Sequence, residues 1–250
     1  MGEKSLEVNE FYDDTSPEIW KRVIGNDLHY HVGWGDGDIL YNAIKHLYQF
    51  IDEKSTILDC GCGWGGTGKV LKQDMNCDVT GVTISQVQSD YISDNNLFPV
   101  VLSDLHDYVP SKNYDVCLFV ESFCHLKNPK MVLNNLREHT KKFIIREYHL
   151  KTDGYPQKYI DNWLMNMYTK DELSCFFTEL DYEMTYFEEH YNEALEPTLD
   201  LWLHNLDKVD NIEKTEHIKL LELSARYLKQ HKEQILKDIG LSTFIFERHD

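Results

Sequence analysis

The chain lacks any long hydrophobic run. Its longest aliphatic and aromatic stretches are only as long as a β-strand, and residues 1–10 are charged, without the apolar core of a signal peptide. Positive charge is also scarce: 25 lysines and arginines stand against 43 acidic residues, for a formal net charge of -18. This balance disfavours nucleic acid or an anionic membrane as a partner. We expect a cytoplasmic protein, a monomer or homodimer, whose partners are neither nucleic acid nor a membrane.

Groups of residues with metal-ligand spacing are missing as well. Six cysteines occur, but Cys60-x-Cys62 does not have zinc spacing and no matching second pair exists. Most of the cysteines fall on predicted strands or beside a glycine loop, which favours reduced thiols over disulfides. His29-x-His31 has no third ligand at a recognisable spacing, so loop packing or a contact with the substrate is the better interpretation. We expect no bound metal.

Glycine, by contrast, is concentrated at one place. Four glycines, Gly61, Gly63, Gly65 and Gly66, follow the β-prone residues 56–58 and Asp59, and residues 67–74 can begin a helix. Glycine in such a loop permits positive φ angles and lets a ligand approach the backbone. The helix directs its free N–H groups at that ligand. The stretch therefore predicts a cofactor held against bare backbone.

The loop also satisfies G-x-G-x-x-G, so a dinucleotide site is the first alternative. That site needs an acidic residue about 20 residues further on, at the end of the second strand. The second predicted strand is 78–84, and Thr83 occupies the position where the carboxylate would stand. The absence of an acidic residue at this position counts against a dehydrogenase. Asp59, directly before the loop, instead lies where it can attract a cationic ligand or orient the loop backbone.

Two motifs identify a family resemblance. Residues 58–66 (LDCGCGWGG) resemble the first motif of class I S-adenosylmethionine-dependent methyltransferases. Residues 81–86 (GVTISQ) resemble the second motif of the cyclopropane fatty acid synthase and plant N-methyltransferase branch, in which threonine, serine and a nearby glutamine replace the acidic residue. The resemblance implies S-adenosylmethionine as cofactor, with S-adenosylhomocysteine as product. It also implies an α/β, Rossmann-like sheet of seven mostly parallel strands with an antiparallel last strand and helices on both faces.

The remaining chain is consistent with one methyltransferase domain. Further strands are expected at 97–102, 114–120, 142–147, 182–190 and 241–248, and helices at 38–50, 85–95, 131–140, 169–180, 199–206, 216–229 and 232–239. Gly240 is expected to stop the last helix. By resemblance to enzymes that act on dimethylglycine or tocopherol precursors, residues 1–53 form a lid, 54–190 the cofactor-binding core, 191–240 a helical cap over the acceptor and 241–250 the last strand.

The resemblance also implies the cofactor site. The expected contacts are Tyr12, Asp59, Gly61, Cys62, Gly63, Thr83, Ser85, Gln86, Asp104, Leu105 and Glu121. Asp104 and the backbone of Leu105 would bind the adenine, the alternative for Asp104 being a cap of a turn. The expected acceptor contacts are Tyr30, Trp34, His125, Tyr148 and Trp202, and for Trp202 helix packing is the competing interpretation.

Residues 114–120 form a run without polar alternation after Asp115, as in a central parallel strand. Ligands bind outside the carboxyl ends of such strands, so the following residues should reach the reacting groups. Glu121 and His125 can accept a proton there, and we expect them to be the catalytic pair.

The predicted reaction is therefore methyl transfer from S-adenosylmethionine to a small soluble molecule, with nitrogen slightly favoured over carbon or oxygen. Two alternatives stay open: cyclopropane synthase-like methylation of a lipid, and a catalytically silent S-adenosylmethionine-binding domain.

Overall fold

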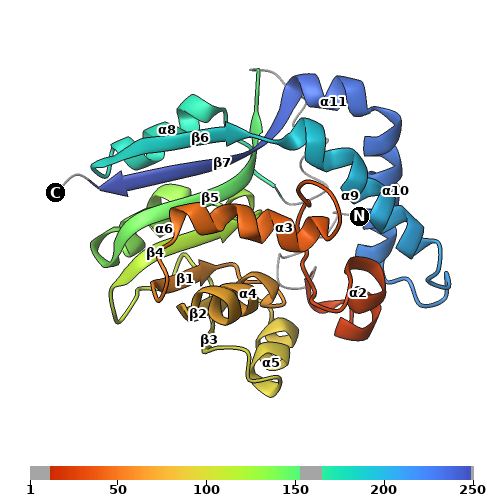
Figure 1. Ribbon diagram of the computed structural model, residues 1–250, viewed down its shortest axis with the longest axis horizontal. Helices are drawn as coiled ribbons and strands as arrows, with labels where there is room; N and C mark the ends of the chain where they lie inside the picture. The colour runs from red at the N-terminus through yellow and green to blue at the C-terminus, as the bar shows by residue number, and fades with distance from the viewer. Residues whose placement is uncertain (1–11, 153–164, 249–250) are drawn as a thin grey trace, which may run out of the picture.

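A mixed β-sheet forms the centre of the structure, a computed structural model that describes residues 12–152 and 165–248. Within these residues the sheet has seven strands in the order β3-β2-β1-β4-β5-β7-β6 (Figure 1). The strands are β1 (Thr56–Cys60), β2 (Asp78–Thr83), β3 (Val100–Leu102), β4 (Tyr114–Val120), β5 (Thr140–Leu150), β6 (Tyr182–Glu189) and β7 (Ile239–Arg248). β7 runs antiparallel to both of its neighbours, and the other neighbouring pairs are parallel. The predicted fold class is confirmed.

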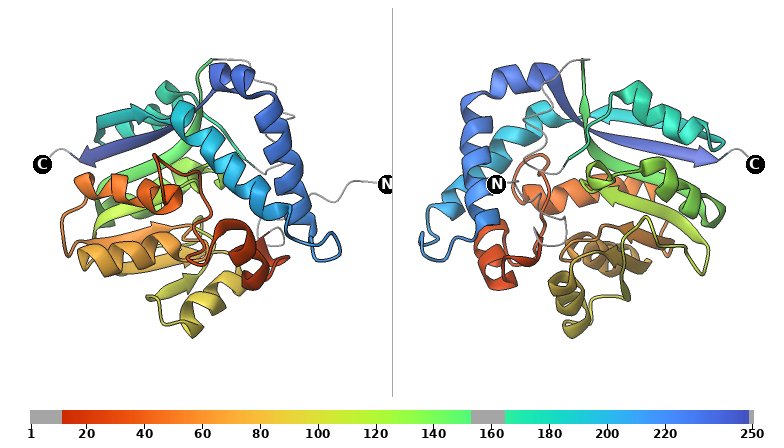
Figure 2. Two further views of the ribbon diagram at one scale, coloured as in Figure 1. Left: turned by 45° about the vertical axis from the view of Figure 1, so that its right-hand side comes forward. Right: turned by 180° about the vertical axis from the view of Figure 1, so that it is seen from behind.

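Helices cover both faces of the sheet (Figures 1 and 2). One layer contains α3 (Ile39–Lys45), α4 (Gly66–Met75) and α5 (Gln86–Asp94), and the other contains α6 (Pro129–Leu136) and α8 (Lys170–Thr178). The part of the chain that the structure describes also contains the short 3-10 helices η1 (His46–Phe50), η2 (Phe123–His125) and η3 (Arg137–His139). Because both faces are covered, the central strands carry apolar residues at consecutive positions. In β4, Val116 and Leu118 pack into one layer, and Cys117 and Phe119 pack into the other.

A third group of helices lies beyond the carboxyl ends of the parallel strands (Figures 1 and 2). It consists of α2 (Pro17–Ile24), α9 (Tyr191–Leu206), α10 (Glu216–Gln230) and α11 (Lys232–Asp238). These helices share a hydrophobic cluster built around residues such as Trp20, Leu199 and Leu221, which also includes Ile239 and Leu241 of β7. Within the described residues it forms a third core beside the two packed on the faces of the sheet, and we call it the helical cap core.

The strand order places a crevice at the ends of β1 and β4. The chain leaves β1 towards β2 on one side, whereas β4 lies on the other side, so loops leaving the two strands diverge. Such a switch point is where open α/β sheets bind ligands. Asp59 of β1 is paired with Leu118 of β4. This register puts the glycine loop opposite Glu121.

Several expected elements have the predicted bounds or nearly so. β4 coincides with the predicted strand, and the capping box of Thr169 and Glu172 begins α8 as predicted. The predicted helix at 38–50 is instead α3 followed by the 3-10 helix η1. β5 is longer than expected, so Tyr148 and His149 lie inside the strand and not after it.

Two expectations about the helical cap core were wrong. The helix predicted from Leu199 begins eight residues earlier, at Tyr191, because Pro197 is accommodated inside α9. Gly240 does not end a helix: it is the second residue of β7, paired with His149, and a Cβ there would collide with the His149 ring. The absence of a side chain is needed for this close approach of two strands.

The division into lid, core, cap and last strand stays a prediction. Residues 1–11 of the lid and residues 249–250 of the last strand lie outside the described part of the chain, as do residues 153–164 of the core.

Candidate active site

A cavity of about 540 Å³ lies at the switch point of the sheet. Its walls come from the loops after β1, β2, β3 and β4, from the segment 28–31, and from α9 and α10. Predicted site residues in its lining are Tyr12, Tyr30, Asp59, Gly61, Cys62, Gly63, Thr83, Asp104, Leu105, Glu121, His125, Tyr148 and Trp202. The fold thus gathers around one cavity residues from both ends of the chain, and the role of each in binding stays a prediction.

The glycine loop presents backbone to this cavity. Gly61 and Gly63 have φ angles of 74° and 53°, in the left-handed region that favours glycine. A Cβ on Gly61 would collide with Ser122 after β4. A Cβ on Gly63 would meet no described atom within 4 Å, so this position faces open space. A ligand can therefore approach the chain directly at Gly63.

Asp59 gives a second observation that fits the cofactor. Its side chain is buried at the end of β1, and burial raises its pKa to about 7. Its Oδ2 atom has no hydrogen-bond partner among the described residues, although it belongs to the cavity lining. A buried acceptor of this kind costs free energy until a donor reaches it. The open backbone and the unpartnered carboxyl oxygen together fit the amino-acid end of S-adenosylmethionine, which brings N–H donors.

The ends of β2 and β3 supply a different part of the lining. Thr83 donates a hydrogen bond to Gln88 Oε1 at 2.8 Å, and Gln88 also lines the cavity. Ser85 and Gln86, predicted to contact the cofactor, lie outside the lining: Ser85 caps α5, and Gln86 is exposed and donates to Asp90. A helix that begins after Ser85 turns position 86 outwards and position 88 inwards. The glutamine that reaches the cavity is therefore Gln88.

Asp104 and Leu105 follow β3, as expected for an adenine site, and both line the cavity. The Asp104 carboxylate also accepts from the backbone N–H of His106 at 2.9 Å and contacts the His106 ring at 2.6 Å. The hydrogen bonds that Asp104 makes within the protein are therefore those of a residue that caps a turn.

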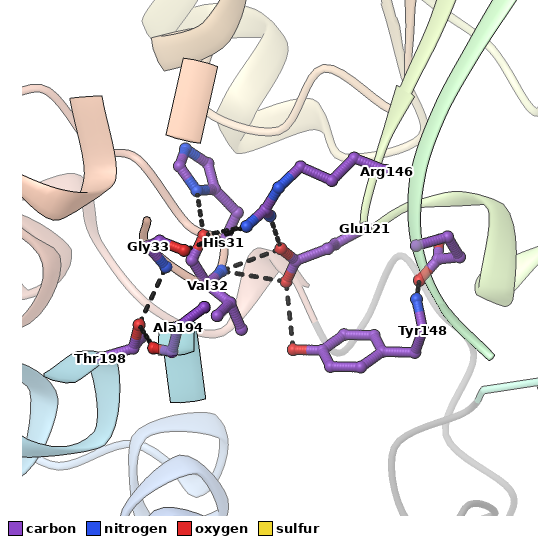
Figure 3. Close-up of polar contacts among 9 residues, drawn as sticks. His31, Val32, Gly33, Glu121, Arg146, Tyr148, Ala194 and Thr198 are labelled. Atoms are coloured by element: carbon purple, nitrogen blue, oxygen red, sulfur yellow. Dashed lines mark hydrogen bonds and ion pairs between the residues drawn. The ribbon is translucent and has the colours of Figure 1, made fainter. Parts of the chain in front are cut away.

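Glu121 is held in a buried network with Arg146 (Figure 3). Arg146 pairs with the Glu121 carboxylate and donates to the carbonyls of Val32 and Gly33, at 2.8 and 3.1 Å. The carboxylate also accepts from the backbone N–H of Val32 at 2.9 Å and from Tyr148 Oη at 3.1 Å. We call this network the Arg146 clamp. Because its oxygens are already bonded to Arg146, Val32 and Tyr148, Glu121 is placed to hold the segment before α3 and not to act as a base.

Strain at Glu121 accompanies the clamp. Its φ angle is 51°, a left-handed conformation that costs a non-glycine residue about 1 kcal/mol or more. The conformation turns the end of β4 so that the side chain meets Val32, which lies 89 positions earlier in the sequence. The clamp therefore fixes the segment 28–33 against the end of β4.

Two tyrosine–histidine pairs face each other at the cavity. Tyr12 Oη lies 2.9 Å from His125 Nε2, and Tyr30 Oη lies 3.1 Å from His217 Nε2. The Tyr12 and His217 rings are 5.5 Å apart, edge to face. Burial raises the pKa of both Tyr12 and Tyr30 far above the usual range, so both phenols keep their protons. Each pair can pass a proton from the cavity to an imidazole.

Trp34 does not reach the cavity. Its ring stacks on His46 with centroids 4.4 Å apart and meets the edge of His190 at the same distance. The predicted contact with the acceptor does not fit this position, because the ring packs against His46 and His190 and lies outside the cavity lining. Trp202 does line the cavity, and its Nε1 is buried without a partner among the described residues.

Sequence reasoning missed several lining residues. The lining residues of α10 carry no motif, and neither does His217, which lies outside the lining and hydrogen-bonds Tyr30, because only folding brings them to the glycine loop. His29 and His31 were noted as a pair, and both line the cavity, with His29 Nδ1 and His31 Nε2 buried and unpartnered among the described residues. The aromatic and histidine-rich character of residues 28–34 was the available signal.

The described residues contain no group of three or more histidine, cysteine or acidic side chains that could hold a metal ion. All six cysteines are unpaired, so the expectation of free thiols is confirmed. In the ranges 12–152 and 165–248, no helix is both long and apolar enough to span a membrane.

Comparisons with known proteins agree with this geometry. Residues 39–185 match the family described as "Methyltransferase domain". The chain is 33% identical over 93 residues to (S)-tetrahydroprotoberberine N-methyltransferase of Eschscholzia californica, a match over 34% of this chain and 27% of that protein. It is 28% identical over 133 residues to cyclopropane-fatty-acyl-phospholipid synthase of Escherichia coli K12, over 43% of this chain and 35% of that protein.

Among solved structures, coclaurine N-methyltransferase bound to N-methylheliamine and S-adenosylhomocysteine has the same fold, with a TM-score of 0.75 at 18% identity over 94% of this chain and 83% of that one. The matches to the two curated relatives span only about a third of their lengths or less. The family match, in contrast, covers more than half of this chain and includes the glycine loop, Asp59 and the end of β4. The chain therefore belongs to the methyltransferase domain family, within the class I S-adenosylmethionine-dependent methyltransferases.

Proposed function

We propose that this protein transfers a methyl group from S-adenosylmethionine to a nitrogen atom of a small soluble molecule. The observation that carries the proposal is the pair of Tyr12 and His125 in the wall of the cavity, together with Tyr30, which also lines the cavity and hydrogen-bonds His217 behind it. Aromatic rings can stabilise an ammonium group, and an imidazole behind a phenol can take its proton. The likeness to a plant enzyme named as an N-methyltransferase supports the same acceptor atom.

When bound, S-adenosylmethionine supplies a methyl group on a positively charged sulfur, so the leaving group is already a good one. The chain has to align the acceptor and exclude water. In the proposal the glycine loop and Asp59 hold the amino-acid end of the cofactor. Thr83, Asp104 and Leu105 line the part of the cavity that receives its adenosine end. The Arg146 clamp keeps the segment 28–33 in place over this site.

The proton of the acceptor needs a route if the amine arrives protonated. The acceptor nitrogen gives its proton to Tyr12 Oη while Tyr12 gives its own proton to His125 Nε2, 2.9 Å away. The nitrogen keeps its electron pair for the methyl group, Tyr12 stays neutral, and His125 becomes the imidazolium. Because the pKa of Tyr12 is raised by burial, a phenolate does not form in this step. His125 is thus the base, and Glu121 is a positioning residue.

The test is incubation of the purified protein with methyl-deuterated S-adenosylmethionine and a host extract. Mass spectrometry of the soluble and lipid fractions then locates the label, and fragmentation locates the methylated atom. We expect the label on a nitrogen of one soluble metabolite. Label on a carbon of fatty acyl chains would replace the proposal with lipid methylation, which the likeness to the bacterial synthase also allows. Bound S-adenosylhomocysteine with no labelled product would indicate a silent binding domain.

A further inference from the structure

Helix α10 forms an apolar wall of the cavity. Its lining residues are Leu220, Leu221, Leu223, Ser224, Ala225, Tyr227 and Leu228, of which only Ser224 lacks a large apolar part or a methyl group. They include positions three and four apart along the helix, so they occupy one continuous side. The carboxyl groups of the described lining, Asp59, Asp104 and Glu121, all lie at strand ends, where apolar residues such as Val82 and Val120 also line the cavity. Helix α10 contributes no charged side chain to the described lining.

Part of this apolar wall is open to solvent. Leu223 is 68% exposed and Tyr227, one turn later, is 40% exposed, although both line the cavity. A single exposed leucine needs no explanation, but two large apolar side chains at adjoining helical positions beside a cavity mark a surface that a ligand can cover. The cavity thus reaches the outside of the protein along apolar side chains.

The charges in the lining select against an anionic ligand. Among the described lining residues the carboxyl groups are Asp59, Asp104 and Glu121, of which Glu121 is already paired with Arg146, and the only lysine or arginine is Lys127. The chain as a whole carries a formal net charge of -18. A cationic ligand is favoured by both the local and the overall charge. An acceptor bearing a phosphate or several carboxylates would find one lysine to bind it.

We infer that the acceptor is an amine with a sizeable apolar body, a ring system or an alkyl chain, which lies against α10 and leaves the cavity past Leu223. This inference rests on the proposed N-methylation and adds the substrate class. The amine lies near Tyr12, Tyr30 and His125, and the apolar body lies on Leu220, Leu223 and Tyr227. Small hydrophilic amines, which would leave this wall in contact with water, are poor acceptors.

Binding of quaternary ammonium ions tests the inference without requiring turnover, because they resemble the methylated product. The protein loaded with S-adenosylhomocysteine is titrated by calorimetry with tetramethylammonium, choline, benzyltrimethylammonium and octyltrimethylammonium. We expect octyltrimethylammonium to bind at least about 50-fold more tightly than tetramethylammonium, the effect of three buried methylenes at about fourfold each. If the protein bound tetramethylammonium or choline as tightly as octyltrimethylammonium, the inference would be overturned.

A matched pair of variants locates the apolar body. Leu223→Ser should weaken binding of octyltrimethylammonium by about fivefold, because it removes apolar contact area, and should leave tetramethylammonium binding unchanged. Ile212→Ser is the control: Ile212 is 98% exposed and lies outside the cavity lining, so neither affinity should change. Both positions are on the surface, so neither variant is expected to lose its fold. An octyl affinity that Leu223→Ser leaves unchanged would contradict the placement on α10.

Turnover separates this inference from the proposed function. N,N-dimethyloctylamine and dimethylaminoethanol are offered with S-adenosylmethionine, and the octyl amine should be methylated at the lower concentration. Methylation of the hydrophilic amine with equal efficiency would keep the proposed N-methylation and overturn the apolar acceptor. If the calorimetric series still depended on Leu223 but the labelled acceptor proved to be methylated on carbon or oxygen, the proposed N-methylation would be wrong and the apolar site on α10 would stand.

Discussion

The two sides of the cavity are built in opposite ways. In the proposed function, the cofactor side comes mainly from one short stretch, Asp59 to Gly66, which offers backbone groups and one buried carboxyl oxygen, with Thr83, Asp104 and Leu105 at its other end. The acceptor side comes from segments far apart in the sequence, such as Tyr30 and His217, and offers aromatic rings and apolar side chains. A backbone surface suits a ligand that never changes, whereas a wall of side chains can be altered without disturbing the strands. In the proposed function, this contrast separates the residues that bind the methyl donor from those that select the acceptor.

The sharpest test of this contrast is a side chain at Gly63. Gly63→Asp should abolish binding of S-adenosylhomocysteine, because the new carboxylate enters the space that the ligand needs. Gly35→Asp is the matched control: Gly35 also has a positive φ, 66°, and open space at its Cβ, but it is not part of the cavity lining. The Gly35→Asp control should introduce similar backbone strain but leave the affinity for S-adenosylhomocysteine unchanged. Calorimetric titration that shows wild-type affinity for Gly63→Asp would place the cofactor elsewhere.

The Arg146 clamp joins the two sides, and breaking it should have the next largest effect. Arg146→Met leaves the buried Glu121 carboxylate without its ion-pair partner, so the free energy of unfolding should fall by about 3 to 5 kcal/mol. Urea unfolding measures this loss. Lys219→Met serves for comparison, since Lys219 and Glu216 form an exposed pair at 2.8 Å that contributes at most about 1 kcal/mol. If the free energy of unfolding fell by a similar amount in Arg146→Met and Lys219→Met, the Arg146 clamp would contribute no more to stability than an exposed ion pair.

A buried carboxyl group behind the acceptor side should make stability depend on pH. Glu147 accepts from the backbone N–H groups of Cys124 and Tyr148, and burial raises its pKa from 4.5 to about 7. Between these values the folded protein holds a proton that the unfolded chain releases. Glu147 therefore lowers the free energy of unfolding as pH rises from about 4.5 to 7, by up to about 3 kcal/mol, and the cost persists above pH 7.

Glu147→Gln should remove this part of the pH dependence. Urea unfolding gives the free energy of unfolding of the wild type and of Glu147→Gln at each pH from 4.5 to 7.5. The contribution of Glu147 is the amount by which the difference between these two free energies changes over that range. The exposed Glu53 provides the control variant Glu53→Gln, which should follow the wild type. Parallel curves for Glu147→Gln and the wild type would mean that Glu147 is ionised throughout.

The smallest expected effect is kinetic. His125→Ala should lower turnover of the true acceptor by about 100-fold, the usual contribution of one general base, and should leave the affinity for S-adenosylhomocysteine unchanged. His139→Ala changes a histidine outside the cavity lining and should affect neither quantity. Steady-state kinetics and calorimetry together separate the two sides of the cavity. Unchanged turnover would remove His125 from the mechanism, and a loss of cofactor affinity would move it to the cofactor side.

The same contrast explains what the sequence could predict. The strand, the glycines and Asp59 are neighbours in the chain, so their pattern is visible before folding, and the family resemblance that it carries implies the fold class. Gln88 was missed because the start of α5 decides which glutamine turns inwards. The clamp of Arg146 on Val32 and the pairing of Tyr30 with His217 depend on contacts between distant segments. No local pattern encodes such contacts.

The helical cap core has a further consequence for how the protein opens. Its cluster, around Trp20, Leu199 and Leu221, is distinct from the two clusters on the faces of the sheet and meets the sheet only at the start of β7 among its buried strand residues. Contiguous units of this kind can unfold on their own while the rest of a protein stays native. Amide hydrogens in α10 should therefore exchange with solvent sooner than those of β4, and the exchange should slow when an acceptor occupies the apolar wall. The part of the molecule that selects the substrate would then also be the part through which the substrate enters.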